Sequence, residues 1–177
     1  GNIPLNPQKG EMTLCKRVSY SLVLIISLSL VLGMQTAAVD FGNIEELIHT
    51  KDLAQIEEAI KRLENHLTIN SDDGEGLWMM AKAHLYLGDQ TEDDKLEVYE
   101  AGKAYAEAAM EFLPASPHPY FWQASLIGRI GETKGIMSSL FMVRPMKDAL
   151  DQVLEFDPNY ADAHWFLSQL YHQAPGF

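Results

Sequence analysis

Apolar residues recur along much of this chain at the spacing of amphipathic helices, and no stretch alternates convincingly between apolar and polar residues as a strand would. Leu77, Ala81, Leu85 and Gly88 share one helical face, and a similar face returns at Tyr120. The other apolar faces comprise Leu53, Ile56, Ile60, Leu63 and Leu67; Val98, Ala101, Tyr105, Ala108 and Phe112; and Met146, Leu150, Val153 and Leu154. The pattern predicts an all-α stack of helix pairs.

Several kinds of residue recur at one interval, which indicates internal repeats. The tryptophans Trp78, Trp122 and Trp165 are separated by 44 and 43 residues. Gly88 and Gly131, each followed by an acidic residue, are 43 residues apart, and we expect both to form turns between paired helices. Independent markers with a shared interval are unlikely to arise by chance. They predict a helix-pair superhelix with a period of about 43–44 residues.

Pro114 and Pro158, which are 44 residues apart, are expected to end the second helix of a pair, because proline cannot continue the hydrogen-bond ladder. The segments Leu-Trp-x-x-Ala…Gly-Asp and Glu-Phe-Asp-Pro-Asn-Tyr-Ala-Asp-Ala resemble the first helix and the boundary of the tetratricopeptide repeat. That repeat has a period of about 34 residues. We therefore expect surplus residues between the helices of each pair, as DQTEDDKLE in one unit and TKGIMSSLFMV in the next.

The two expected inserts differ in character. DQTEDDKLE is polar and acidic, and it is most simply a solvated loop. GIMSSLFMV is apolar, and as a free loop it would expose a hydrophobic patch. It either folds as an extra turn of helix that packs into the superhelix, or it lines a ligand cavity or a partner surface, where methionines adapt their shape. These interpretations are compatible.

Charge and composition narrow the class of protein. The formal net charge is −12, and no basic run is present, which argues against a nucleic-acid-binding protein. Cys15 is the only cysteine, so a disulfide framework or a zinc-cysteine cluster is excluded. The histidines have no spacing that would bring two of them to one metal ion, and no nucleotide-binding or hydrolase motif occurs. We expect no enzyme activity, no cofactor and no metal.

The beginning of the chain resembles a targeting segment. In residues 12–38, a Lys-Arg pair precedes an apolar run and an A-x-A-like site, which is typical of a secretory signal peptide. The run is shorter than the about 20 residues of a spanning helix, which favours cleavage over the alternative of a membrane anchor. Residues 1–11 are then an upstream leader or a cloning remnant, and residues 39–177 are the helical-repeat domain. Cys15 precedes the apolar run, so the protein is not expected to be a lipoprotein. The signal predicts a periplasmic or secreted protein.

The end of the chain raises a separate expectation. DPNYADAHWFLSQLYHQAPGF is the first helix of a third unit, and its partner helix is missing. A superhelix normally ends in a cap with a polar outer face, yet this helix carries Phe166, Leu170 and Tyr171. We expect the chain to be truncated here, or another subunit to cover this face, with a second copy of the chain as one candidate.

Residues 75–177 also resemble the T-component family associated with TRAP transporters. The resemblance rests on PYFWQASLIGRIGETKGIMSSLFMVRPMKDALDQVLEFDPNYADAHWFLSQLYHQAPG. It implies a non-catalytic periplasmic protein that docks the solute-binding protein of a TRAP-type transporter, with a small hydrophobic or amphipathic organic acid as a candidate ligand. Eukaryotic microtubule-regulator proteins share a similar extended repeat, but the signal peptide favours the bacterial setting. The alternative is a general tetratricopeptide scaffold for protein assembly in the cell envelope.

The candidate binding residues follow from the repeat. First helices usually line the concave face of such a superhelix, so the three tryptophans, at equivalent positions, either line a groove or lock one helix pair onto the next. Arg144 is expected to meet a carboxylate or to form a surface salt bridge. The full set of candidate residues is Trp78, Tyr120, Trp122, Phe141, Met142, Arg144 and Trp165.

Overall fold

The computed structural model describes residues 39–173, and this part of the chain is helical with no strand. This confirms the predicted all-α class. Its helices are α2 (Phe41–His49), α3 (Leu53–Ile69), α4 (Gly74–Gln90), α5 (Lys95–Phe112), α6 (Pro117–Lys134), α7 (Ile136–Phe156) and α8 (Ala161–Gln173). None of these helices is both long enough and apolar enough to span a bilayer.

Local capping explains where several helices begin. The side chains of Asp40, Asp52 and Asp73 accept hydrogen bonds from backbone N–H groups in the first turns of α2, α3 and α4. Such caps satisfy donors that have no partner inside the helix. Pro114 and Pro158 lie in the links that follow α5 and α7, as predicted.

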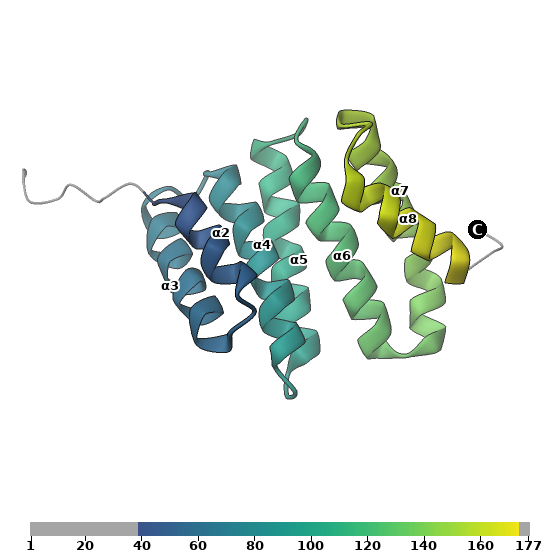
Figure 1. The fold of residues 1–177 in the computed structure, drawn as a ribbon, viewed down its shortest axis with the longest axis horizontal. Helices are drawn as coiled ribbons and strands as arrows, with labels where there is room; N and C mark the ends of the chain where they lie inside the picture. The colour runs from purple at the N-terminus through teal and green to yellow at the C-terminus, as the bar shows by residue number, and fades with distance from the viewer. Residues whose placement is uncertain (1–38, 174–177) are drawn as a thin grey trace, which may run out of the picture. The chain divides into compact units, whose positions relative to one another are not determined.

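The helices pack as antiparallel pairs that stack into a superhelix. α4 packs against α5 and α6 against α7, while α4 also contacts both α2 and α6. The first helices α2, α4 and α6 therefore lie side by side. Figure 1 shows the progression from α2 and α3 at one end to α7 and α8 at the other. α4, α6 and α8 begin at residues 74, 117 and 161, so successive first helices are offset by 43 and 44 residues.

The surplus residues of each repeat lengthen the helices instead of forming loops, so the predicted position of the inserts was wrong. Only residues 91–94 separate α4 from α5, and only Gly135 separates α6 from α7. Gly135 has φ 95° and ψ 175°, a conformation that side chains rarely tolerate. The apolar stretch of residues 136–143 forms the first turns of α7, as the interpretation of an extra helical turn expected. Most of these side chains stay exposed, so the turns do not pack into the superhelix as that interpretation also held.

Gly88 and Gly131 lie inside α4 and α6, near their ends, and the turns themselves follow a few residues later. Both glycines allow close helix packing: a Cβ on Gly88 would overlap the Tyr99 ring of α5, and one on Gly131 would crowd Ser139 and Met142 of α7. Glycine at these positions therefore brings the paired helices together where the chain is about to reverse.

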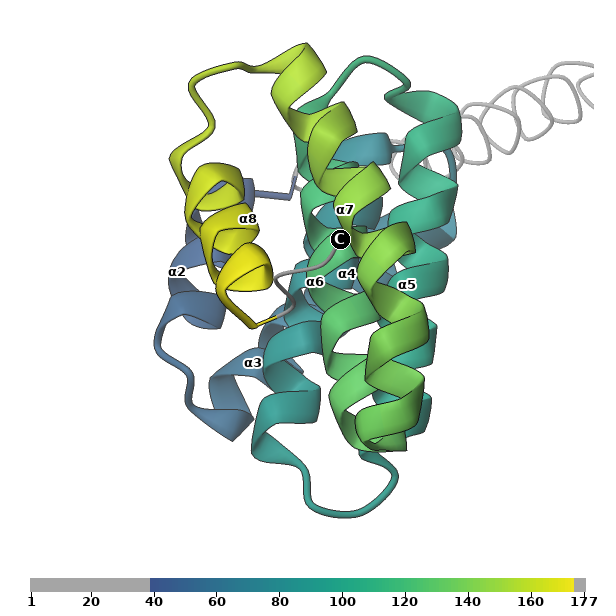
Figure 2. The same ribbon diagram turned by 90° about the vertical axis from the view of Figure 1, so that its right-hand side faces the viewer.

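One proline interrupts the longest helix. Pro145 lies within α7, where it has no N–H to donate to the carbonyl of Phe141. The residues before it face the end of α6, and those after it, including Leu150 and Val153, belong to the core between α6, α7 and α8. Figure 2 shows α7 beside α6, with α8 crossing at a distance from α4 and α5.

Candidate functional site

A groove of about 730 Å³ opens between α4, α6, α7 and α8. α4 and α6 pack side by side, whereas α8 makes its contacts mainly with α7. α8 therefore leaves space over α6 and over the first turns of α7. A concave site of this size, lined by apolar side chains and a few polar groups, is typical of ligand and peptide binding.

One wall of the groove is formed by the first turns of α7. Ile136, Leu140 and Val143 line it at helical spacing. Ile136 is 83% exposed, and Phe141, on the neighbouring face of the same turns, is 73% exposed. Contiguous apolar side chains on a surface usually mark an interaction site. We call Ile136, Met137, Leu140 and Phe141 the apolar rim.

A second wall of the groove is aromatic. Trp165 and Phe166 of α8 and Trp122 of α6 line it, together with Tyr86 of α4. Trp165 is 65% exposed, although indole rings are usually largely buried. Trp122 is half-buried and packs against core residues on both sides of α6. The groove thus presents large aromatic side chains together with the aliphatic side chains of α7.

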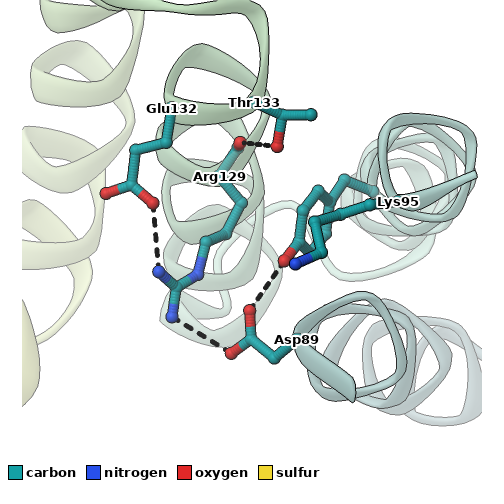
Figure 3. Close-up of a pocket in the computed structure, with 6 residues that line it drawn as sticks. Asp89, Lys95, Arg129, Glu132 and Thr133 are labelled. Carbon is teal, nitrogen blue, oxygen red and sulfur yellow. Dashed lines mark hydrogen bonds and ion pairs between the residues drawn. The ribbon is translucent and has the colours of Figure 1, made fainter. Parts of the chain in front are cut away.

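A network of charged and hydroxyl groups lies at the end of the groove where α4 and α6 finish (Figure 3). Tyr99 donates its hydroxyl to Asp89 at 2.7 Å, and Arg129 bridges Asp89 and Glu132 at 3.0 Å each. Burial raises the pKa of Tyr99, and the hydrogen bond to Asp89 raises it further. Tyr99 therefore stays protonated as a donor, and the network fixes the ends of α4, α5 and α6 relative to one another.

A buried cation lies further along the inner face. The Lys82 ammonium, on a residue only 4% exposed, donates to Glu45 at 2.5 Å and lies 3.1 Å from His49 Nε2. It also lies 5.3 Å from the centre of the Trp122 ring. The hydrogen bond from Lys82 holds the pKa of Glu45 below its ordinary value. This cluster joins α2 to α4 and α6.

The structure separates the predicted site residues. Trp122, Met142 and Trp165 line the groove, and Phe141 is on the apolar rim beside it. Trp78 is 7% exposed, belongs to the core between α2, α3, α4 and α5, and stacks on His118.

The other two predicted residues lie outside the groove. Tyr120 packs against Phe156 and donates to the carbonyl of Pro114. Arg144 is exposed on α7.

The three tryptophans do not occupy equivalent positions, so that prediction was wrong. The offset from α4 to α6 is 43 residues, whereas Trp78 and Trp122 are 44 apart. The counterparts of Trp78 are Phe121 and Trp165, and those of Trp122 are Met79 and Phe166. One residue rotates a side chain by about 100° around a helix. That rotation turns Trp122 away from the position that Trp78 and Phe121 occupy in the core.

The polar residues of the groove were missed at the sequence level. Asp89, Arg129 and Glu132 line the groove, and only Asp89 belongs to a quoted motif, as the last residue of the Gly-Asp pair. The repeat offered one signal for two of them: Asp89 and Glu132 are 43 residues apart, and they directly follow Gly88 and Gly131.

The comparisons with known proteins give one consistent result. Residues 43–173 match the family described as "Regulator of microtubule dynamics protein 1-3". The chain is 29% identical over 99 residues to Regulator of microtubule dynamics protein 3 of Mus musculus, which covers 55% of this chain and 21% of the mouse protein. The Xenopus laevis protein of the same name is 24% identical over 124 residues, or 69% of this chain and 27% of the frog protein. The chain therefore spans about a quarter or less of these relatives.

These matches overturn the resemblance to the T-component family of TRAP transporters. The docking function, the periplasmic solute-binding partner and the organic-acid ligand were all drawn from it, and they were wrong, as was the cell-envelope scaffold. The relatives come from vertebrates, which also overturns the bacterial periplasmic localisation. The proposed signal peptide, residues 12–38, lies outside the described residues. The two families were hard to separate because both use an extended helical repeat.

Proposed function

The chain belongs to the family of Regulator of microtubule dynamics protein 1-3, and on this basis we propose that its helical unit is a non-catalytic binding module. In this proposal it contributes to the regulation of microtubule dynamics by holding a segment of a partner protein in the groove between α6, α7 and α8. The observation that carries the proposal is the apolar rim beside the aromatic wall.

The apolar rim supports binding on energetic grounds. Ile136, Met137, Leu140 and Phe141 are all exposed on adjacent turns of one helix. Covering apolar surface yields roughly 25 cal/mol per Å² removed from water. An apolar partner segment would therefore gain affinity here, and the same residues contribute little to folding because they are already exposed.

Polar side chains suit a peptide backbone. Gln169 and Gln173 lie four residues apart on α8 and line the groove, as does Ser125 on α6. Amide side chains offer both donors and acceptors, so they match the alternating groups of a peptide. The apolar wall would supply affinity, and these groups would fix the direction of the bound segment.

The contacts of Ser125 favour binding over catalysis. Its hydroxyl donates to the carbonyl of Phe121 in its own helix, at 2.9 Å. A serine nucleophile would instead need a general base within hydrogen-bond reach. The proposal assigns the groove no chemical step.

The test compares the full chain with a rim variant, Leu140→Asp/Phe141→Asp, in a eukaryotic cell extract that assembles microtubules. Microtubule growth rate and catastrophe frequency are followed by fluorescence microscopy. We expect the wild-type chain to change these parameters and the variant to lose the effect, since two carboxylates would prevent apolar burial.

Glu155→Gln/Asp148→Asn is the matched control, because it changes two exposed residues of α7 outside the groove. Circular dichroism verifies that all three proteins are equally helical. An effect of the rim variant equal to that of the wild type would contradict a role for the groove. No effect of any protein on microtubules would contradict the proposed function itself.

A further inference from the structure

We infer that the groove selects a partner segment in which a short apolar stretch is flanked at both ends by lysine or arginine. This inference rests on the proposed function, and it adds the chemistry of the partner. Three observations carry it: the charge of the helical unit, the pairing of charges in the groove, and the spacing of the acidic groups along it.

The helical unit is strongly acidic. The whole chain has 13 Lys and Arg against 25 Asp and Glu, and three of these bases and one acid precede residue 39. Residues 39–173 therefore have 10 bases and 24 acids, a net charge of −14. A field of this sign accelerates the approach of a basic segment and repels an acidic one.

Within the groove, the acids are incompletely neutralised. Its ionisable lining consists of Asp89, Glu132 and Asp162 against Lys51 and Arg129. Arg129 is already held by Asp89 and Glu132. Asp162 forms no ion pair among the described residues. Lys51 forms no ion pair among these residues either, and its ammonium lies 5.8 Å from the centre of the Tyr86 ring. The lining therefore has one acid more than it has bases, and Asp162 is the acid that an incoming ammonium group meets without competition.

The tyrosines around the groove respond to the same field. Burial raises the pKa of Tyr86, and the carboxylates of Asp89 and Asp162 raise it further. Burial raises the pKa of Tyr160 to about 12, with Asp162 and Asp157 adding to the shift. Burial is the main cause of both shifts, and the nearby carboxylates add to it in the direction expected for an acidic face.

The acids lie at opposite ends of the apolar section. Asp162 is in the first turn of α8, and Glu132 is near the end of α6. Both α6 and α8 are first helices of their repeats, so their residues can be compared by register. The register counterpart of Asp162 on α6 is His118, which is 14 residues before Glu132. Along the direction of a first helix, this offset corresponds to a rise of roughly 21 Å. An extended segment of about six residues spans that distance. The partner segment would therefore place about six residues between its basic ends.

The experiment uses three fluorescent peptides with one shared six-residue apolar core, flanked at both ends by Lys, Ser or Glu. Binding to the full chain is measured by fluorescence anisotropy at low and high salt. We expect the Lys peptide to bind about tenfold more tightly than the Glu peptide at about 50 mM NaCl, and this preference to fade at about 500 mM as charges are screened.

Two variants locate the effect. Asp162→Asn should weaken the Lys peptide by roughly two- to fivefold, as expected for one partly exposed charge pair, and leave the Ser peptide unchanged. Unchanged Ser-peptide binding also shows that α8 is intact. Asp148→Asn, on the part of α7 outside the groove, removes the same charge and should have a smaller effect.

Three other outcomes would each overturn part of the inference. Equal or tighter binding of the Glu peptide would overturn the charge selection while leaving the groove as a peptide site. Equal effects of the two variants would reduce the selection to net charge and overturn the assignment of Asp162. Binding to phosphatidylcholine vesicles with no binding of any peptide would overturn both the inference and the proposed function.

Discussion

Trp78 and Trp165 have the same place in their helices but different surroundings, and this difference separates folding from binding at the scale of single residues. Trp78 is enclosed by the core of α2, α3, α4 and α5. Trp165 projects into the groove. Both residues are tryptophans, but neighbouring helices cover Trp78 whereas Trp165 stays exposed at the groove.

Alanine at the two positions should therefore have opposite consequences. Trp78→Ala is expected to cost about 3–5 kcal/mol of unfolding free energy, because it leaves a cavity. Trp165→Ala should change stability by less than about 0.5 kcal/mol, as for other exposed positions, and should weaken partner binding. Urea denaturation and peptide anisotropy measure the two effects. Similar losses of stability for both variants would show that Trp165 is a core residue.

The Lys82–Glu45 pair gives a second residue-scale prediction. Glu45→Gln should lower the free energy of unfolding by about 1 kcal/mol at pH 7, because the buried ammonium keeps a neutral acceptor in place of a carboxylate. The expected loss of unfolding free energy is small because the Glu45 side chain is 42% exposed, and water screens the pair. Glu46→Gln, one residue along and exposed, is the control.

The pH dependence of this variant has a definite sign. Lys82 lowers the pKa of folded Glu45 below its ordinary 4.5. The stabilisation is therefore complete above pH 4.5 and is lost as the pH falls through the lowered pKa. The difference between wild type and Glu45→Gln should shrink in acid. A difference that stays constant down to pH 3 would show that the ion pair does not cause it.

At the scale of the helices, close contact at Gly88 controls how α4 meets α5. Gly88→Ala is expected to destabilise the protein by about 1–3 kcal/mol, because the added methyl group overlaps the Tyr99 ring. Gly128→Ala is the matched control: it gains the same helix propensity, and its nearest neighbour is the flexible thioether of Met146, at 3.2 Å. Thermal unfolding by circular dichroism compares them. Equal unfolding temperatures would contradict the packing argument.

The sequence predicted the helices better than it predicted their ends. Periodic apolar positions such as Leu77, Ala81 and Leu85 depend only on local helix geometry, so the helix pairs and their interval were found. The extended α7 was harder to place, because residues 136–143 have the apolar content of a core helix, while Ile136 and Phe141 have nothing packed on them. The one-residue turn at Gly135 has no local signal beyond its glycine. The rotation of Trp122 depends on a one-residue difference between the tryptophan spacing and the helix offset, which becomes visible only once the helix bounds are known.

The groove lay beyond what the sequence could predict, even though three of its residues were named. Its existence depends on how α8 crosses α7, and that angle is set by the side chains between them, including Met146 and Leu167. The pairing of Arg129 with Asp89 joins residues 40 positions apart on different helices. No local pattern contains that information.

At the scale of the whole unit, like charges oppose folding. With a net charge of −14 on residues 39–173, mutual repulsion should exceed the gain from the surface ion pairs. Raising NaCl from about 20 mM to about 500 mM is therefore expected to raise the unfolding temperature by a few degrees, as screening weakens the repulsion. Calorimetry measures this shift, and Asp148→Lys should reduce it. A fall in unfolding temperature with salt would show that the ion pairs dominate.

Pro145 divides α7 into a first part that opens more easily and a second part that is held by the core. Without the hydrogen bond to the Phe141 carbonyl, the turns before the proline are only weakly coupled to those after it, which are anchored in the core by Leu150 and Val153. The amides of residues 136–144 should exchange with solvent through local opening, at a much lower free energy than the amides of the core. One side of the groove can thus change shape while the superhelix stays folded, so segments of different bulk can be bound at little energetic cost.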